Sequence, residues 1–201
     1  MTTFEQSLLS EQHVKYWQPI SAVSDSLGEF LSDCTRKVFH FEPFCDADKS
    51  LRNVHRVDAI AIRRKNSQKT EINLLEFKGG KTSTDWTKDC FALKAFDTLH
   101  CGFSKLVGNN RRAWADLFSD EELVFNFYIV ISDNHIMASL ETNPKNIIMQ
   151  RDAQQIAREQ LDSLQGTLHR YEDKHPFDFV KVTSASKFRH KLNTIVDDIQ
   201  I

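Results

Sequence analysis

The chain has 201 residues, of which 40% are hydrophobic and 27% are charged, and its formal net charge is −2. This length and balance predict one globular domain spanning 1–201 and exclude a disordered or low-complexity chain. The near-neutral charge provides no overall attraction to nucleic acid or to membranes. Any such partner must therefore be argued from local charge.

The cellular setting follows from what the sequence lacks. Residues 1–17 have neither the basic start nor the apolar run of a secretion signal. No apolar run approaches the ~20 residues that span a bilayer. The four cysteines, Cys34, Cys45, Cys90 and Cys101, show no CxxC or CxxH spacing. We expect a cytoplasmic protein with no membrane partner and with reduced, mostly buried thiols.

Hydrophobic patterns in the first part of the chain predict helices followed by a group of strands. Apolar residues recur at helical spacing in the two helical segments, and short apolar runs bounded by polar residues indicate the strands. The predicted elements are a short helix at 3–14, a helix at 21–37, and strands at 37–44, 57–62 and 72–78. The polar stretch between the last two strands predicts a hairpin turn.

The second part predicts alternating helices and strands. The elements are helices at 84–103, 111–118, 146–171 and 187–198, and strands at 123–132 and 177–184. The apolar runs at 57–62, broken only by Asp58, and at 124–131 are typical of a sheet covered on both faces. The fold class is therefore α/β, with a central mixed sheet flanked by helices.

Three ionisable residues stand out in this pattern: Asp58, Glu76 and Lys78. Side chains alternate along a strand, so Glu76 and Lys78 share one face. Asp58 begins the preceding strand and, in a hairpin, lies beside the end of the next one. We therefore expect the three groups to converge at one end of the sheet.

Two neighbouring carboxylates in an apolar strand require a partner that neutralises them. A hard divalent cation does so, and two carboxylates with a main-chain carbonyl are oxygen ligands suited to Mg²⁺. Lys78 beside such an ion can orient water or offset charge on a phosphate. These groups predict metal-assisted hydrolysis of a phosphodiester.

Val57-Asp58, followed at the end of the next strand by Glu76-Phe77-Lys78, resembles the PD-(D/E)XK motif of a nuclease superfamily. That superfamily includes restriction endonucleases, Holliday-junction resolvases and DNA-repair exonucleases. The resemblance implies a helix–strand–strand–strand–helix–strand core at about 21–132, with a C-terminal helix and strand added at 133–201. It also implies Asp58, Glu76 and the Phe77 carbonyl as ligands of Mg²⁺ or Mn²⁺, and Lys78 as the catalytic lysine.

The sequence departs from the family pattern at three places. Val57 stands where a proline is usual, and Lys94 and Thr98 stand where the exonuclease branch has glutamine and tyrosine four residues apart. Some members add an acidic residue from the first helix, for which Glu29 is the candidate. A second Glu-x-Lys, at 172–174, lies in a polar setting and predicts an exposed helix end.

Basic residues near the motif are candidates for phosphate contacts. They are Lys81 and Lys88 after the motif, and Arg63 and Arg64 in the hairpin turn. For the first pair the alternative is a solvated, mixed-charge helix face. His55 is either a phosphate contact or an ordinary residue at the entry to a strand.

The function predicted first is a Mg²⁺-dependent deoxyribonuclease, acting as an endonuclease rather than an exonuclease. Its substrate is expected to be DNA, with RNA left open, and a homodimer would suit symmetric cutting of two strands. The alternative is a protein of the same fold with weak or lost catalysis, serving as a nucleic-acid-binding or regulatory module. A third interpretation places Glu76 and Lys78 on an edge strand facing water.

Overall fold

The computed structural model describes most of the chain outside two long segments. The described residues are 3–24, 31–65, 69–79, 88–108, 123–134, 159, 162, 165–166 and 177–199. The predicted helix at 111–118, most of the one at 146–171, and the Glu-x-Lys at 172–174 lie outside these residues. Within the described part, no helix is both long and apolar enough to cross a bilayer.

Six strands form one mixed sheet in the order β1-β2-β3-β4-β5-β6. Neighbouring strands from β1 to β4 are antiparallel, whereas β5 is parallel to β4 and β6 is parallel to β5. The strands are β1 (Trp17–Pro19), β2 (Lys37–His40), β3 (Ala59–Arg64), β4 (Thr70–Lys78), β5 (Leu123–Ile131) and β6 (Phe179–Ser184). This arrangement confirms the predicted α/β class with a central mixed sheet.

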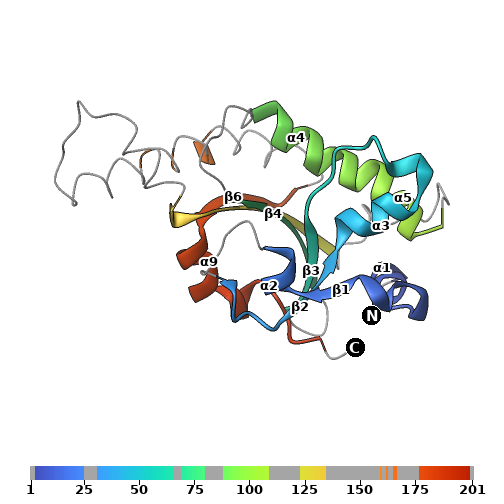
Figure 1. The fold of residues 1–201 in the computed structure, drawn as a ribbon, viewed down its shortest axis with the longest axis horizontal. Coiled ribbons are helices and arrows are strands. Elements are labelled where there is room, and N and C mark those ends of the chain that lie inside the picture. The colour runs from blue at the N-terminus through green and yellow to red at the C-terminus, as the bar shows by residue number, and fades with distance from the viewer. Residues whose placement is uncertain are drawn as a thin grey trace.

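Helices cover both faces of the curved sheet (Figure 1). One face packs against α1 (Thr3–Leu8), α3 (Phe41–Ala47), α4 (Lys88–Asp97) and α5 (Phe103–Leu106). The other packs against α2 (Ile20–Val23) and α9 (Ala185–His190), together with the segment after α9. We call these the α4 face and the α9 face.

The hairpin of β3 and β4 lies in the middle of the sheet. Its register pairs Ala59 with Leu75 and Arg64 with Thr70. Because β4 lies between β3 and β5, it is an interior strand, and all of its residues before Lys78 are buried. The interpretation of Glu76 and Lys78 as groups on a water-facing edge strand is therefore wrong.

The predicted strand at 37–44 is correct only as far as His40, because α3 begins at Phe41. Pro43 explains the change. It has no N–H to donate to a strand ladder, but it is tolerated in the first turn of a helix, where the N–H groups have no intrahelical acceptor. Phe39, in β2, and Phe41, in α3, are both fully buried. The alternation of aromatic residues in this segment therefore reflects packing in the core and not one continuous strand.

The predicted helix at 21–37 is also shorter than expected. The structure has α2 at Ile20–Val23, and residues 32–36 are not helical. The N–H groups of Ile20 and Ser21 donate to the carbonyls of Arg36 and Cys34, so this segment runs alongside α2 as it leads into β2. Strand β1, which has three residues, was not predicted.

The helix predicted at 84–103 is described from Lys88 and continues to Leu106 through a π-helical turn, η4 (Thr98–Gly102). At the C-terminus, the helix predicted at 187–198 is wrong beyond His190. There the structure has α9 and then a 3-10 turn, η6 (Leu192–Thr194). The later residues bond to the sheet instead, since Asp197 N–H donates to the carbonyl of Ile62.

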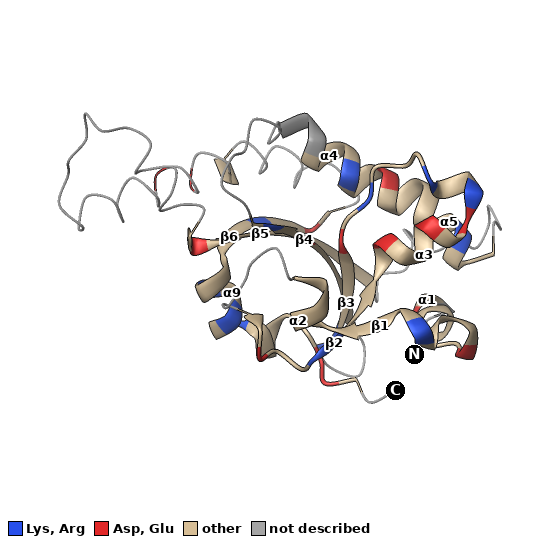
Figure 2. Ribbon diagram, in the orientation of Figure 1, with Lys and Arg blue, Asp and Glu red and all other residues tan. Residues whose placement is uncertain are grey.

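Short connecting elements complete the described chain. The 3-10 helices η1 (Glu11–Tyr16) and η3 (Lys49–Leu51) precede β1 and β3, respectively. Of the described cysteines, Cys34 and Cys45 are buried and Cys101 is partly buried, and all three are free thiols as expected. Charged residues lie mainly on the helices and loops around the sheet (Figure 2).

Candidate active site

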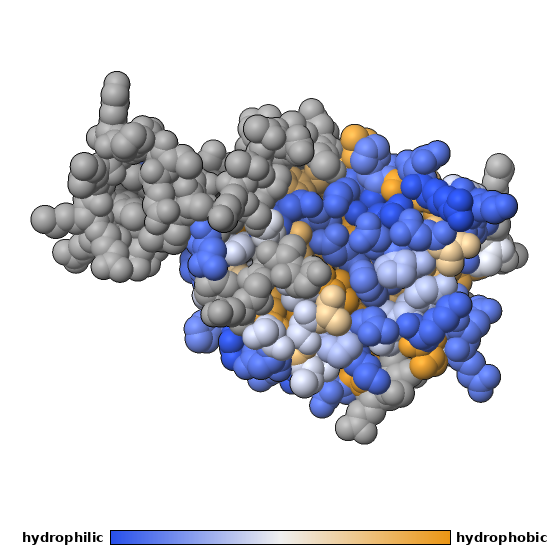
Figure 3. Space-filling view, viewed as in Figure 1, coloured by the Kyte–Doolittle hydropathy of each residue, from blue (hydrophilic) through white to orange (hydrophobic). Residues whose placement is uncertain are grey.

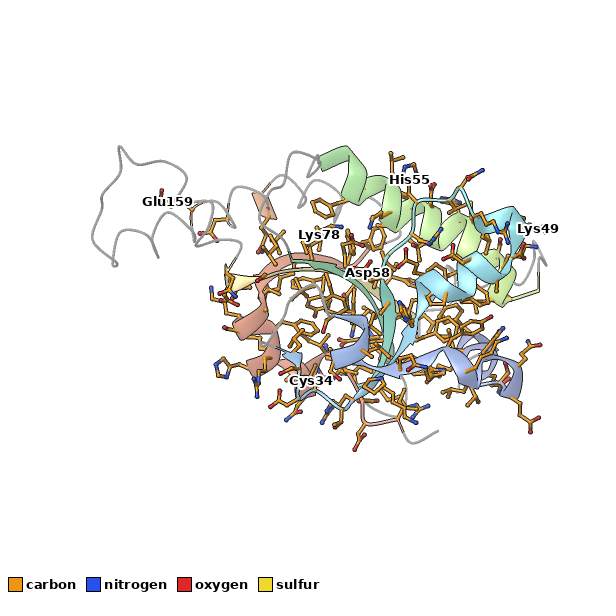
Figure 4. The ribbon with its side chains drawn as sticks, in the orientation of Figure 1. Cys34, Lys49, His55, Asp58, Lys78 and Glu159 are labelled. Atoms are coloured by element: carbon orange, nitrogen blue, oxygen red, sulfur yellow. The ribbon has the colours of Figure 1, made fainter. Side chains whose placement is uncertain are left out.

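Asp58, Glu76 and Lys78 lie at one end of the central hairpin. Asp58 immediately precedes β3, and Glu76 and Lys78 lie at the end of β4. The register that pairs Ala59 with Leu75 places Asp58 beside Glu76. The structure therefore brings together, on the α4 face, the three residues that the sequence predicted to converge. Asp58 and Lys78 are labelled in Figure 4.

The backbone around Asp58 is held by three different elements. Its carboxylate Oδ2 accepts a 2.6 Å hydrogen bond from the N–H of Phe77 on β4. Its carbonyl accepts from the N–H of Phe41 at 2.9 Å. The N–H of Val57 donates to the buried hydroxyl of Thr98 at 3.1 Å. These bonds fix where the carboxylate lies at the start of β3.

Glu76 is fully buried, and within the described part of the chain one of its two carboxylate oxygens is bonded. Its Oε1 lies 2.5 Å from Nζ of Lys78 and 2.5 Å from Nζ of Lys94 on α4. Its Oε2 is buried and has no hydrogen-bond partner among the residues that the structure describes. Buried polar atoms nearly always have a hydrogen-bond partner, so we expect this oxygen to bind an additional group.

The surroundings of Asp58 make its carboxyl group a weaker acid than that of an ordinary aspartate. Burial raises the pKa of Asp58 to about 7, and the neighbouring carboxylate of Glu76 contributes to the increase. Lys94, the Phe77 N–H and Lys78 oppose this shift without cancelling it. Near neutral pH this carboxyl can therefore bind or release a proton.

Lys78 is shifted in the direction that keeps it charged. Burial alone would lower its pKa, but the carboxylate of Glu76, the hydrogen bond to that carboxylate and the nearby Asp58 raise the pKa above its ordinary value. Lys78 remains a cation at any physiological pH. Lys78 can therefore supply positive charge and hydrogen bonds, and a neutral amine base is not expected here.

Lys94 is the site residue whose role the sequence did not predict. Its side chain comes from α4, on the helix face that carries the buried residues Phe91, Ala95 and Leu99. Thr98, one turn further on, bonds to Val57. The sequence did offer a signal for this role. Lys94 and Thr98 are two polar residues, four apart, on an otherwise apolar helix face. A glutamine and a tyrosine have the same spacing in the exonuclease branch of the family that the motif resembles.

The carboxylate oxygens of Asp58 and Glu76 suit a cation whose remaining ligands are water or substrate. Among the described residues, no three His, Cys, Asp or Glu side chains come close enough together to hold a metal ion. Two carboxylates are present, however, and Oε2 of Glu76 is unpartnered. Mg²⁺ typically binds one or two carboxylates and fills its remaining positions with water and substrate phosphates. The pair Asp58 and Glu76 meets that requirement.

The Phe77 carbonyl, the third predicted ligand, is oriented toward Asp58. In an antiparallel ladder a residue directs its N–H and its C=O to the same neighbour. Since the Phe77 N–H donates to Asp58, its carbonyl is directed to that side as well. Glu29 lies outside the described residues.

Of the other residues predicted to contact phosphate, some lie away from Asp58 and Glu76. Arg63 and Arg64 lie at the far end of β3 from Asp58, and Arg64 pairs with the buried Glu5 at 3.0 Å. His55 is exposed, and its Nδ1 lies 3.2 Å from Oδ2 of Asp97 on α4. Lys81 and the side chain of Lys88 lie outside the described residues. The surface around α3, α4 and α5 is largely hydrophilic in the view of Figure 3.

Comparisons of this chain with protein-family models, with curated proteins and with solved structures find no match.

Proposed function

We propose that this chain is a metal-dependent nuclease that hydrolyses phosphodiester bonds in DNA. The observation that carries the proposal is the buried carboxylate of Glu76, which has one unpartnered oxygen beside Asp58 and Lys78. Carboxylates and a lysine in this arrangement are suited to binding Mg²⁺ or Mn²⁺ and a phosphate.

The order of elements supports a PD-(D/E)XK-type core. α2 precedes three antiparallel strands, β2 to β4, with the short helix α3 inserted between β2 and β3, and α4 then leads to β5, which lies parallel to β4. Apart from the insertion of α3, this is the helix–strand–strand–strand–helix–strand order that the motif implied. β6 extends the same sheet as the C-terminal addition.

Each residue has a role in this proposal. Asp58 and Glu76 would hold the cation, with the Phe77 carbonyl as an additional ligand. When bound, the cation would supply an activated water and charge stabilisation at the phosphate. Lys78 stays protonated and would donate hydrogen bonds to a phosphate oxygen or orient the attacking water. Lys94 holds Glu76 in place and supplies a second positive charge.

Local charge indicates that cation and substrate bind together. Asp58 and Glu76 carry at most two negative charges, and Lys78 and Lys94 carry two positive charges. A divalent cation alone would leave this buried region strongly positive, which is costly. A phosphodiester would offset that charge. Binding of Mn²⁺ should therefore be weak alone and tighter in the presence of DNA.

Cleavage of plasmid and linear DNA in Mg²⁺ or Mn²⁺ tests the proposal. Wild-type protein should cut only with the metal present, and Asp58→Ala and Lys78→Ala should abolish cutting while remaining folded by circular dichroism. Lys174→Ala, in the second Glu-x-Lys of the sequence, is the matched control and should cut normally. Equal cutting by Asp58→Ala and wild type would refute the assignment.

A second candidate is a non-catalytic binding or regulatory protein of the same fold. The observation in its favour is that Lys78 and Lys94 already neutralise Glu76 without any metal. Calorimetric titration with Mn²⁺, with and without a short DNA duplex, separates the two functions. A saturable signal that is lost in Asp58→Ala supports the enzyme. Absence of any signal in both titrations supports the binding protein.

A further inference from the structure

The α9 face carries a separate pocket with a cavity volume of about 230 Å³. Residues from β3, β4, β5, β6, α9 and the turn after α9 line it. Its basic residues are Arg63, Lys181, Lys187 and Lys191, and its one acidic residue is Glu71. Because Arg63 and Glu71 lie at the end of the hairpin away from Asp58, this pocket is distinct from the candidate active site.

The positive charge of this pocket is not balanced within the described part of the chain. No carboxylate there forms an ion pair with Lys181, Lys187 or Lys191. The carboxylate of Glu71 is already paired, since its Oε1 accepts from Nζ of Lys65 at 3.1 Å. Basic positions on α9 are coloured blue on the ribbon of Figure 2. Lysines gathered in this way without a counter-charge repel one another.

Two of the lining groups respond to this environment. Burial lowers the pKa of Lys181, and Lys191 and Lys187 lower it further. Burial also raises the pKa of the Tyr128 hydroxyl to about 12, with Glu71 adding to the increase and Arg63 opposing it. The hydroxyl of Tyr128 is therefore a hydrogen-bond donor at neutral pH, in a pocket whose other charges are mainly cationic.

We propose that this pocket binds a phosphate group, either as free phosphate or as the phosphomonoester of a small ligand. Lys181, Lys187 and Lys191 surround the cavity from β6 and from α9 and the turn that follows it, and Tyr128 and Thr183 provide hydroxyl groups at the sheet. Charge-assisted hydrogen bonds from several lysines suit a dianion better than a monoanion. The cavity is smaller than the ~300–1,000 Å³ typical of pockets for drug-sized ligands, which favours a small anionic group.

Calorimetric titration in EDTA tests this proposal independently of the nuclease. The probes are inorganic phosphate and AMP, with adenosine as the uncharged control. Wild-type protein should give saturable binding to phosphate or AMP and none to adenosine. Lys181→Met, which keeps the length and apolar stem of the side chain, should weaken that binding about tenfold or more.

Lys49→Met is the matched control, because Lys49 is exposed on η3 at the end of the molecule opposite α9 (Figure 4). It should bind phosphate as the wild type does. Lys191→Met is a second test variant that is not expected to impair folding, since it relieves repulsion of Lys181. It too should weaken binding.

The outcomes are distinguishable. Tighter binding of AMP than of phosphate would identify a phosphomonoester as the ligand, and binding of phosphate alone would identify the free anion. Absence of saturable binding, or equal binding by folded Lys181→Met and wild type, would overturn the proposal. Neither result depends on whether the chain cuts DNA.

Discussion

The two faces of the sheet place lysines in opposite electrostatic environments. On the α4 face, Lys78 lies against the carboxylates of Glu76 and Asp58, and its pKa is raised. On the α9 face, Lys181 is partly buried beside Lys191 and Lys187, and its pKa is lowered. The same side chain is stabilised as a cation on one face and destabilised as a cation on the other.

This difference indicates what each face requires from a ligand. The α4 face has paired charges, one unpartnered carboxylate oxygen and a carboxyl that holds its proton up to a pH of about 7. It can accept a cation when a phosphate arrives with it. The α9 face has a surplus of cations and calls for an anion. Removing the charge of Glu76 should therefore destabilise the first face, whereas removing the charge of a lysine should stabilise the second.

The largest effect is expected at Glu76. Glu76→Gln would leave Lys78 and Lys94 facing a neutral amide in a buried site, and breaking a buried ion pair on one side typically costs about 3–5 kcal/mol. Both lysines keep some exposure, 24% and 19% of their side chains, so we expect the lower end of that range. Urea denaturation measures the loss of stability.

Asp33→Asn is the matched control for Glu76→Gln. Asp33 forms an ion pair with Arg189, but 63% of its side chain is exposed. Exposed ion pairs contribute less than about 1 kcal/mol. Equal losses in the two variants would contradict the description of Glu76 as a buried carboxylate that balances two lysines.

The next effect is the pH dependence caused by Asp58. Its pKa is raised from an ordinary value of 3.8 to about 7 in the folded protein, so the folded state binds the proton more tightly than the unfolded state. The metal-free protein should therefore lose stability as the pH rises from about 4 to about 7, with a slope of at most about 1.4 kcal/mol per pH unit for this proton.

Asp58→Asn should remove that loss, so that the variant is more stable than wild type at pH 8 in EDTA. Urea denaturation across this pH range is the measurement. Asp48→Asn is the control, because hydrogen bonds from Ser50 lower the pKa of Asp48 to about 2 and its titration falls below this range. A wild-type pH profile unchanged by Asp58→Asn would show that this carboxyl titrates normally.

A smaller effect is expected at Thr98. Thr98→Val removes the acceptor of the Val57 N–H and leaves a buried donor unpaired, which costs about 1–3 kcal/mol. Thr98→Ser keeps the hydroxyl and should lose less. Cleavage should fall in Thr98→Val even where the protein is fully folded, because Asp58 follows Val57 directly. Normal cleavage by folded Thr98→Val would exclude this positioning role.

The smallest effect is expected on the α9 face, and it has the opposite sign. Lys191→Met should stabilise the phosphate-free protein, because it relieves repulsion of Lys181. The gain should stay below about 0.5 kcal/mol, since solvent screens exposed charges. A thermal melt without phosphate measures it, with Lys49→Met as the neutral comparison. Destabilisation by Lys191→Met would mean that its side chain has a structural role.

Much of the sheet could be predicted from local pattern. β5 and the segments 59–62 and 72–77 of the central hairpin are rich in apolar residues, and their burial on both faces agrees with that composition. The convergence of Asp58 with Glu76 followed from strand alternation and hairpin geometry alone. Local pattern failed at Phe41, where α3 begins within an aromatic segment that resembles a strand and has Pro43 in its first turn.

The sequence by itself determined the central strands β3, β4 and β5 and which of their residues share a face, because that property depends on a spacing of two along one chain. Only the tertiary structure decided that Lys94 contacts Glu76, that Thr98 supports Val57, and that three lysines from β6, α9 and the turn after it surround one cavity. The contacts of Lys94 and Thr98 join residues that are 18 and 41 positions apart in sequence, and all of these arrangements depend on how helices pack on the sheet. The spacing of residues along the chain does not predict that packing.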